Sequence, residues 1–495
     1  MKHANVATDA RSVDASIIII GTGFSGLGMA IKLKQSGRDD FLILEKQQEV
    51  GGCWRDNTYP GCCCDIPSHL YSFSFEQKTD WSKKYPPQNE IYEYIKSCAS
   101  KYDLYRHIQF GQEVQQIRFC DDTSLWHVHL KDGSQRVARF VIAGKGPLHV
   151  PSIPNIQGVE QFAGESFHSS QWNHDIDLTG KRVAVVGTGA SAIQFIPQIA
   201  SKVKSLHVFQ RSPGWIVPRP DRYYRGIEKA LFKWIPFWQK LYRQSIFYSH
   251  EIRVGLLDEK SFYHKQAKKM ALKHLESTVE DPEIRQQLTP DYVLGCKRLL
   301  ISNDYYPTFN RPNVSLVNAG VEEITPQGLI SSDGREVEAD IIIWGTGFEA
   351  ADPLDKGFLF GPGGKDLFER WDIEGAQAHK GVSVAGIPNF FFMVGPNSGL
   401  GHNSMILMIE AQINYVLQCL DYIEAHDVQL FDVRRDAQNA YNETLQENTH
   451  GRVWESGCQS WYLNKHGQNT TVWPGYVTGY QQQMRKLKPQ EYLTE

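Results

Sequence analysis

The sequence of 495 residues lacks several features that would assign it to common protein classes. No uninterrupted apolar run approaches the roughly 20 residues that a membrane-spanning helix needs. The net charge is −4 and no basic stripe is present, which argues against nucleic acid as a partner. The N-terminal residues are polar and mixed in charge, unlike a secretory signal peptide. The sequence therefore predicts neither a membrane span nor a nucleic-acid-binding function.

Cysteine patterns typical of metal or disulfide sites are also missing. The 9 cysteines are an odd number, and three of them are adjacent at Cys62, Cys63 and Cys64. Nothing resembles a paired disulfide framework or a zinc site with two CxxC motifs. Adjacent cysteines do not easily form an unstrained bridge, which argues against a disulfide reductase. The simplest interpretation is reduced thiols in a cytoplasmic protein.

Length and composition indicate a multidomain globular protein. At ~100–200 residues per domain, the chain predicts roughly two to four domains. The apolar content of 41% and the charged content of 22% are ordinary for this class. The 12 Trp, 22 Tyr and 24 Phe residues suit large cores, and they also suit sites for flat ligands.

A strand–turn–helix–strand unit stands near the N-terminus. Four isoleucines at 17–20 lead into a turn with Gly21, Gly23 and Gly26, then into a helical pattern and a second strand at 41–45. These glycines permit a tight turn, a close approach to a pyrophosphate and close helix packing, and the helix N-terminus faces the anion. Glu45 ends the second strand and can accept hydrogen bonds from ribose hydroxyls. This unit predicts an FAD site.

A second unit of the same kind begins at 182. Its turn contains Gly187, Thr188, Gly189 and Ser191. Where the first unit has an acid, the second has Arg211, whose guanidinium can pair with a 2′-phosphate through two parallel hydrogen bonds. The second unit therefore predicts an NADPH site. The alternative for this arginine is an ordinary solvated surface position.

Two further segments differ from the nucleotide units. The stretch 51–65, GGCWRDNTYPGCCCD, combines glycines that let backbone run close to a flavin with the flat face of Trp54 and the carboxylate of Asp65. A buried carboxylate there needs a partner, either a cation or the cofactor. Residues 221–295 are expected to form a helical insert. Their amphipathic stretch 227–247 could pack normally, line a tunnel or touch a membrane surface.

Two long motifs, in the right order, resemble those of the type I Baeyer–Villiger monooxygenases, which belong to the class B flavoprotein monooxygenases. The motif GGxWxxxxYPGxxxD comes earlier in the chain and matches Gly51, Gly52, Trp54, Tyr59, Pro60, Gly61 and Asp65. The motif FxGxxxHxxxW follows, between the nucleotide units, at Phe162, Gly164, His168 and Trp172. The resemblance covers nearly the whole chain, except for about the first dozen residues.

The resemblance implies an α/β fold with two Rossmann-like dinucleotide-binding domains and a helical insert. We expect an FAD-binding domain from 1–150 and 380–495, an NADP-binding domain from 151–220 and 296–379, and an insert at 221–295. His168 and Trp172 are expected to hold a linker between the two dinucleotide domains. Asn173 stands where the family usually has Pro or Asp, and the turn Trp344-Gly345-Thr346-Gly347 stands where it often has Ala-Thr-Gly.

The resemblance also implies individual site residues. The segment 297–314 resembles the one that carries the family's active-site arginine, which would be Arg298, with Lys297 near the NADP phosphate. The segment 460–462 resembles the one that brings a Trp to the NADP, here Trp461. Tyr71 is expected among the FAD contacts. His402 and Asn403 are further candidates for contact with the flavin or the substrate.

The implied reaction is NADPH- and O₂-dependent insertion of one oxygen next to a ketone carbonyl, through a C4a-peroxyflavin, to give an ester or lactone. The permanent charge of Arg298 would keep the peroxide anionic and stabilise the oxyanion of the adduct. Asp65 would hold and orient the arginine.

Two other functions stay open at this stage. The first is a flavin monooxygenase that oxidises nitrogen or sulfur, against which Trp172 argues, and the second is a non-enzymatic FAD/NADP redox sensor. The expected partners are a small ketone and O₂, and the expected state is a monomer or weak oligomer. The identity of the ketone does not follow from the sequence.

Overall fold

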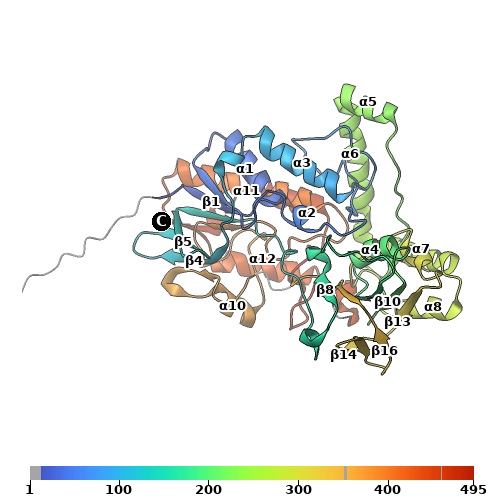
Figure 1. The fold of residues 1–495 in the computed structure, drawn as a ribbon. Coiled ribbons are helices and arrows are strands. Elements are labelled where there is room, and N and C mark those ends of the chain that lie inside the picture. The colour runs from blue at the N-terminus through green and yellow to red at the C-terminus, as the bar shows by residue number, and fades with distance from the viewer. Residues whose placement is uncertain (1–12, 350–353, 459) are drawn as a thin grey trace, which may run out of the picture.

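Two parallel sheets organise the molecule. The computed structural model describes residues 13–349, 354–458 and 460–495 (Figure 1). Each sheet has five strands, and every strand pair within the two sheets is parallel. The α/β fold with two Rossmann-like sheets that the sequence predicts is therefore confirmed. None of the helices in these ranges is long and apolar enough to cross a membrane.

The first sheet combines strands from both ends of the chain. Its strand order is β19-β7-β1-β2-β3. The strands are β1 (Ile17–Ile20), β2 (Phe41–Leu44), β3 (Ile108–Gln109), β7 (Phe140–Ala143) and β19 (Phe390–Phe392). The four isoleucines of β1 are all buried, as expected for a parallel strand covered on both faces. Helix α1 (Phe24–Gln35) packs against α11 (Met405–Ala425), and α11 packs against α13 (Val477–Met484).

The second sheet has the order β13-β10-β9-β17-β8. Its strands are β8 (Glu165–His168), β9 (Arg182–Val186), β10 (Ser205–Phe209), β13 (Val314–Val317) and β17 (Ile341–Trp344). Helix α4 (Ala192–Ile199) follows β9 and packs against α9 (Tyr305–Thr308). In this sheet, too, the central strands β9 and β17 are almost wholly buried.

Smaller sheets surround the two parallel ones. One four-stranded sheet contains β4 (Val114–Cys120), β5 (Leu125–Leu130), β6 (Gln135–Ala138) and β18 (Leu359–Phe360). A three-stranded sheet contains β14 (Val321–Thr325), β15 (Gly328–Ser331) and β16 (Glu336–Glu338). Two strand pairs are β11 (Ile216–Val217) with β12 (Leu300–Ile301), and β20 (Phe431–Val433) with β21 (Tyr492–Thr494). A turn at 131–133 connects β5 and β6.

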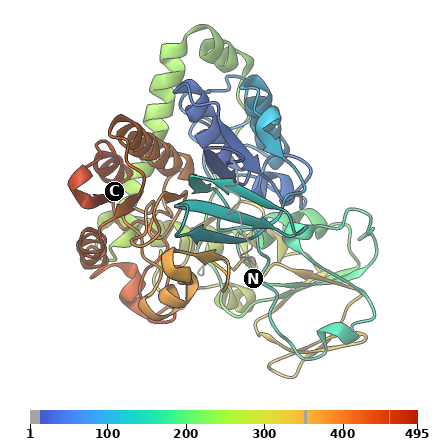
Figure 2. The same ribbon diagram turned by 90° about the vertical axis from the view of Figure 1, so that its left-hand side faces the viewer.

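Helices predominate between 221 and 295, as the sequence predicts. They are α5 (Gly226–Trp234), α6 (Pro236–Glu251), α7 (Phe262–Thr278) and α8 (Pro282–Gln287). Helices α5 and α6 form a hairpin that projects from the rest of the protein in both views (Figures 1 and 2). The remaining α-helices are α2 (Cys53–Asp56), α3 (Gln88–Lys101), α10 (Leu367–Glu374) and α12 (Arg435–Glu447).

The glycine turn after β1 depends on close backbone contact. Gly21 has a φ of +92°, a conformation that side chains disfavour. A Cβ atom at Gly26 would lie only 1.9 Å from the carbonyl oxygen of Gly21. The start of α1 can therefore approach β1 only because Gly26 has no side chain.

We predict that Gly26→Ala lowers the midpoint of thermal unfolding strongly, because the backbone must move to accept the methyl group. Overpacking of this kind typically costs about 1–3 kcal/mol. Gly479→Ala is a matched control, because nothing lies within 4 Å of a Cβ at that helical glycine. The control is expected to keep or slightly raise the midpoint. Equal midpoints for the two variants would contradict the packing argument.

Candidate active site

Arg298 and Asp65 form an ion pair between segments that are 233 residues apart in the chain. Arg298 lies in the loop before β12, and Asp65 follows the three adjacent cysteines. The Nε atom of Arg298 donates to Oδ2 of Asp65 at 3.1 Å, and Nη2 donates to the same oxygen. Their side chains are 30% and 32% exposed. The pair is thus fixed by the protein but still accessible to a bound molecule.

The pair stays charged at neutral pH. Burial by itself would raise the pKa of Asp65, but the charge and hydrogen bonds of Arg298 lower this pKa below its usual value. The negative charge of Asp65 in turn raises the pKa of Arg298, although burial opposes the shift. The site therefore holds a permanent cation with a fixed orientation.

Two side chains that sequence reasoning did not select act on this pair. The charge of Arg253 contributes to the lowered pKa of Asp65. Burial raises the pKa of Tyr462, while the positive charge of Arg298 opposes that shift. Arg253 follows α6 in the predicted insert, where no motif marks it. Tyr462 adjoins the predicted Trp461, so its position could have been inferred from that motif.

The first glycine turn forms a cradle beside Glu45. This carboxylate is buried and accepts hydrogen bonds from the backbone N–H of Thr22 at 3.1 Å and from its hydroxyl at 2.5 Å. The N-cap residue of α1 is Gly23, which has no side chain that could cap the helix. A Cβ atom at Gly52 would lie 3.1 Å from Cα of Gly23. The arrangement leaves the N-terminus of α1 without side-chain partners, as a pyrophosphate site requires.

Trp54 and Tyr71, both predicted as FAD contacts, lie together. The indole Nε1 of Trp54 donates to the hydroxyl of Tyr71 at 3.1 Å, and the ring centroids are 5.5 Å apart. Phe24, the first residue of α1, packs edge-on against Tyr71 with centroids 5.3 Å apart. These aromatic residues therefore adjoin the first glycine turn.

The second turn is equally tight. Gly187 has a φ of +106°, and a Cβ atom there would lie 2.4 Å from the carbonyl oxygen of Gly345. Thr188, Gly189 and Ser191 continue the turn into α4, with Gly189 exposed and Thr188 and Ser191 partly buried. This turn presents backbone N–H groups at a helix N-terminus, like the first.

Positively charged side chains lie close together just after β10, the second strand of this unit. Lys297 Nζ donates to the hydroxyl of Ser212 at 2.8 Å. Burial and the nearby charge of Arg211 lower the pKa of Lys297. Arg211 itself is exposed. Two cations and a hydroxyl that lie near one another can bind a dianionic phosphate.

Residues 165–168 of the FxGxxxHxxxW motif form strand β8 of the second sheet, and the role of the motif as a linker stays a prediction. Strand β8 pairs in parallel with β17, and His168 is opposite Trp344. Trp344 Nε1 donates to the hydroxyl of Ser166 at 2.7 Å. Gly164 is required, because its Cβ would lie 2.3 Å from the carbonyl of Asp340. Strand β8 is an edge strand with exposed residues, and its sequence therefore lacks an apolar run.

His168 and Trp172 pack inside this second unit. His168 is buried, and its Nδ1 lies 2.8 Å from the hydroxyl of Ser170. Burial lowers the pKa of His168. Trp172 lies between Phe167 and Phe195, with both ring centroids at 5.3 Å. Phe162 packs against a neighbouring apolar cluster. These contacts fit a structural role for the motif.

The segment 51–65 connects the two α/β units directly. Gln194 of α4 accepts hydrogen bonds from the Tyr59 hydroxyl at 3.1 Å and the Cys63 backbone N–H at 3.2 Å. Its amide nitrogen donates back to the Cys63 carbonyl at 3.1 Å. The hydroxyl of Thr58 lies 2.8 Å from His174 Nε2. The segment that carries Asp65 is therefore held by the second unit.

Cys296 and Cys458 form a disulfide across 162 residues. The prediction of reduced thiols is wrong at these two positions, and the other seven cysteines are free. A pairing over such a distance has no spacing pattern in the sequence. The bond joins the loop before Arg298 to the loop before Trp461. Trp461 is 40% exposed and lies 4.5 Å, centroid to centroid, from the buried Tyr462.

His402 and Asn403 lie near the C-terminal end of α6. Asn403 Nδ2 donates to Glu251 Oε2 at 3.1 Å, and Glu251 also accepts from the Thr478 backbone N–H at 2.9 Å. Burial and the charge of Arg253 lower the pKa of His402 to about 4. His402 is therefore neutral at neutral pH, and its contact with a flavin or substrate stays a prediction.

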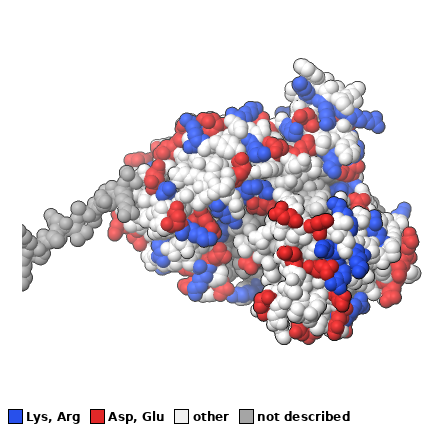
Figure 3. Space-filling model, viewed as in Figure 1, with Lys and Arg blue, Asp and Glu red and all other residues white. Residues whose placement is uncertain are grey.

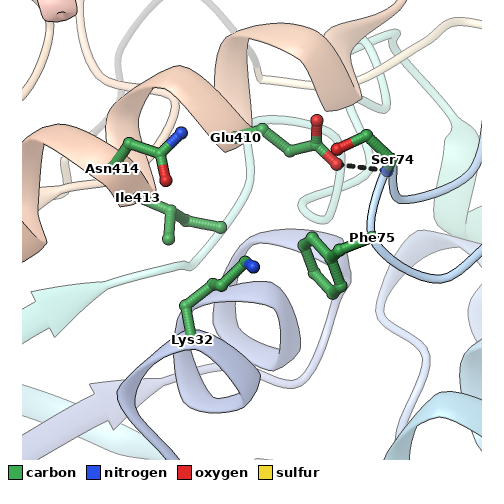
Figure 4. Close-up of a pocket in the computed structure, with 6 residues that line it drawn as sticks. All are labelled: Lys32, Ser74, Phe75, Glu410, Ile413 and Asn414. Carbon is green, nitrogen blue, oxygen red and sulfur yellow. Dashed lines mark hydrogen bonds between the residues drawn. The ribbon is translucent and has the colours of Figure 1, made fainter. Parts of the chain in front are cut away.

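A small pocket between α1 and α11 is separate from these residues (Figure 4). Glu410 projects toward the loop at Ser74, whose backbone N–H donates to it at 2.5 Å. Lys32 lies over the ring of Phe75 at 4.1 Å from its centroid. None of the six residues that line the pocket was predicted as a site residue. The pocket therefore does not belong to the glycine turns or to the Arg298 site.

Comparisons with known proteins agree with this arrangement. The family of pyridine nucleotide-disulphide oxidoreductases matches residues 18–227. A Baeyer-Villiger monooxygenase from Pseudomonas aeruginosa is 44% identical, over 98% of this chain and 92% of its own length. A closed structure of cyclohexanone monooxygenase matches with a TM-score of 0.88 at 27% identity, covering 98% of this chain and 100% of the other. The monooxygenase OTEMO in complex with FAD and NADP matches with a TM-score of 0.86 at 27% identity, over 98% and 100% of the two chains.

We predict that thiol titration of the denatured, unreduced protein detects seven thiols, and nine after reduction. Cys458→Ala should lower the free energy of unfolding by about 2–5 kcal/mol, because the long loop is no longer closed. Cys120→Ala, at a free and partly buried cysteine, is the control and should change it little. Nine thiols before reduction would show that the pair is not oxidised.

Proposed function

Because the chain belongs to the Baeyer–Villiger monooxygenase family, we propose that it converts a ketone to an ester or lactone at a site centred on Arg298 and Asp65. The enzyme is a monooxygenase that uses FAD, NADPH and O₂. The observation that carries the assignment of the site is the ion pair between these residues, because it provides a permanent, oriented and accessible cation.

The chain's own residues fit both cofactors. The cradle of Gly21, Gly23 and Gly52 beside Glu45 suits the pyrophosphate and ribose of FAD, with Trp54 and Tyr71 close to it. The second turn suits NADPH, and the cations near Ser212 suit its 2′-phosphate. When bound, the two cofactors supply the electrons and the activated oxygen for the reaction.

The two sheets support a division into domains. We propose an FAD-binding domain from 1–150 and 380–495, since the first sheet combines strands from both ends of the chain. We propose an NADP-binding domain from 151–220 and 296–379, with 221–295 inserted into it. Asp65 then comes from the first domain and Arg298 from the second, and the ion pair forms where the two domains meet.

Arg298 acts on the charge that develops at the carbonyl. Addition of an oxygen nucleophile turns the ketone carbonyl into an oxyanion, and a guanidinium nearby stabilises that charge in the transition state. Asp65 fixes the direction of the guanidinium through hydrogen bonds to one carboxylate oxygen. Tyr462 is buried, and it lies close enough to Arg298 for the charge of the guanidinium to act on the pKa of the tyrosine.

We further propose a small ketone as the substrate of a monomer or weak oligomer. The cytoplasm stays the proposed location because the reaction consumes NADPH. Cys296 and Cys458 are paired, so the expectation of reduced thiols does not extend to these two residues. In a reducing compartment this bond would be open to reduction.

We predict that Arg298→Ala lowers the rate of ester formation about 10²–10³-fold, because one oriented donor to the oxyanion is lost. Arg298→Lys should retain part of the activity, since it keeps the charge but not the fork of donors. The measurement is chromatography of products from a ketone and, in parallel, from a thioether. Arg434→Ala, at an exposed ion pair, is the control and should not change the rate. Ester formation near the wild-type rate in Arg298→Ala would remove this residue from the mechanism, and sulfoxide as the only product would favour heteroatom oxidation.

We predict that Arg211→Ala raises the KM for NADPH at least tenfold, because a bidentate partner of the 2′-phosphate is lost. The KM for NADH should change little, since NADH has no 2′-phosphate. Arg335→Ala, which removes another exposed arginine, is the control. Steady-state NADPH and NADH oxidation measures both constants. Equal losses with the two cofactors would mean that Arg211 does not bind the phosphate.

A further inference from the structure

The α5–α6 hairpin exposes large apolar side chains at its projecting tip. Ile227, Trp234 and Phe237 are 69%, 76% and 68% exposed. Ile235, Trp238, Leu241 and Tyr248 are also exposed. Single exposed apolar residues are normal on a protein surface, but a contiguous group of this size marks an interaction site. We refer to the exposed apolar residues of 227–241 as the hairpin tip.

The hairpin tip is also basic, in a chain whose net charge is −4. Residues 227–241 contain three lysines and one acid, Glu228. Glu228 is already paired with Arg222 at 2.7 Å. Lys233 and Lys240 are exposed, and Lys233 Nζ lies 5.3 Å from the ring centroid of Trp234. Figure 3 shows Lys and Arg side chains around white surface at this projection.

The base of the hairpin is firmly packed, so the exposed tip is not a poorly formed core. His69 is buried and contacts Phe232 and Tyr242 of the hairpin and Tyr224 just before it. Gln239 Nε2 donates to the Lys78 carbonyl at 2.9 Å. These contacts fix the hairpin on the segment around 69–78, and its outer surface has no partner among the described residues near it.

We propose that the hairpin tip binds the surface of an anionic lipid membrane. Trp and other large apolar side chains flanked by Lys and Arg are the residues that settle at a membrane interface. The positive charge complements anionic headgroups. A second copy of the chain fits less well, because a two-fold contact would bring two basic tips together. The projecting shape also suits a broad fluid surface better than a protein groove.

Helix α6 connects this tip to the candidate site. It ends at Glu251, which accepts the hydrogen bond from Asn403. If the proposed function holds, the enzyme would lie at a surface in which apolar ketones dissolve. Lipid binding itself does not depend on that function, and the experiment below measures it without turnover.

The test is flotation of the whole protein with vesicles of phosphatidylglycerol and phosphatidylcholine, and with vesicles of phosphatidylcholine alone. We expect the wild-type protein to float with the anionic vesicles and to bind the neutral ones at least fivefold more weakly. Trp234→Ser/Trp238→Ser should weaken binding to the anionic vesicles at least fivefold. Lys233→Glu/Lys240→Glu should weaken it further, because each lost lysine costs roughly fivefold.

Matched controls lie elsewhere on the surface. Ile373→Ser removes an apolar side chain that is 77% exposed, and Lys202→Glu/Lys486→Glu reverses two exposed lysines. Both should bind vesicles like the wild type, and all variants should oxidise NADPH like the wild type in solution. Failure of the wild type to float, or flotation of the tip variants like the wild type, would overturn the proposal. A wild-type dimer that the tip variants convert to a monomer would overturn it in favour of a second copy.

Discussion

The ion pair of Arg298 and Asp65 requires two distant parts of the chain to meet with a fixed geometry. Each partner lies in a loop, and a loop by itself does not hold a charged group in one orientation. Contacts with residues outside these two loops hold both partners in place. Gln194 binds the segment that carries Asp65, and the disulfide of Cys296 restrains the segment that carries Arg298. The position of the cation therefore depends on the contact between the two α/β units.

The need for segments to approach one another closely also explains the glycines of the two turns. The first turn must admit a dinucleotide close to α1, and Gly26 lets that helix approach β1. The second turn repeats the arrangement with Gly187 against Gly345. Both proposed cofactor sites lie at helix N-termini, while the segment 51–65 runs from one unit to the other. Cofactor binding and the placement of the cation are thus two results of one architecture.

Local patterns made much of this predictable from sequence. Each nucleotide unit begins with an apolar run that forms a buried strand and leads into a glycine turn. These runs are the four isoleucines before Gly21 and the apolar residues before Gly187, and they allowed both units to be located in the sequence. Interactions between distant residues could not be located in this way. The disulfide joins residues with no spacing pattern, and Arg253 acts on Asp65 from a segment that resembled a simple insert. The edge strand β8 could not be predicted either, because two of its four residues are exposed and no apolar run marks it.

The central claim is that Asp65 contributes to the reaction only by orienting Arg298. A double-mutant cycle of Asp65→Asn and Arg298→Ala, with kcat/KM for ketone conversion as the readout, tests it most directly. The account predicts that the double variant is no slower than Arg298→Ala alone, because an orienting carboxylate has no role once the guanidinium is gone. If the two losses instead multiply, Asp65 acts independently of Arg298 and the account of the site is wrong.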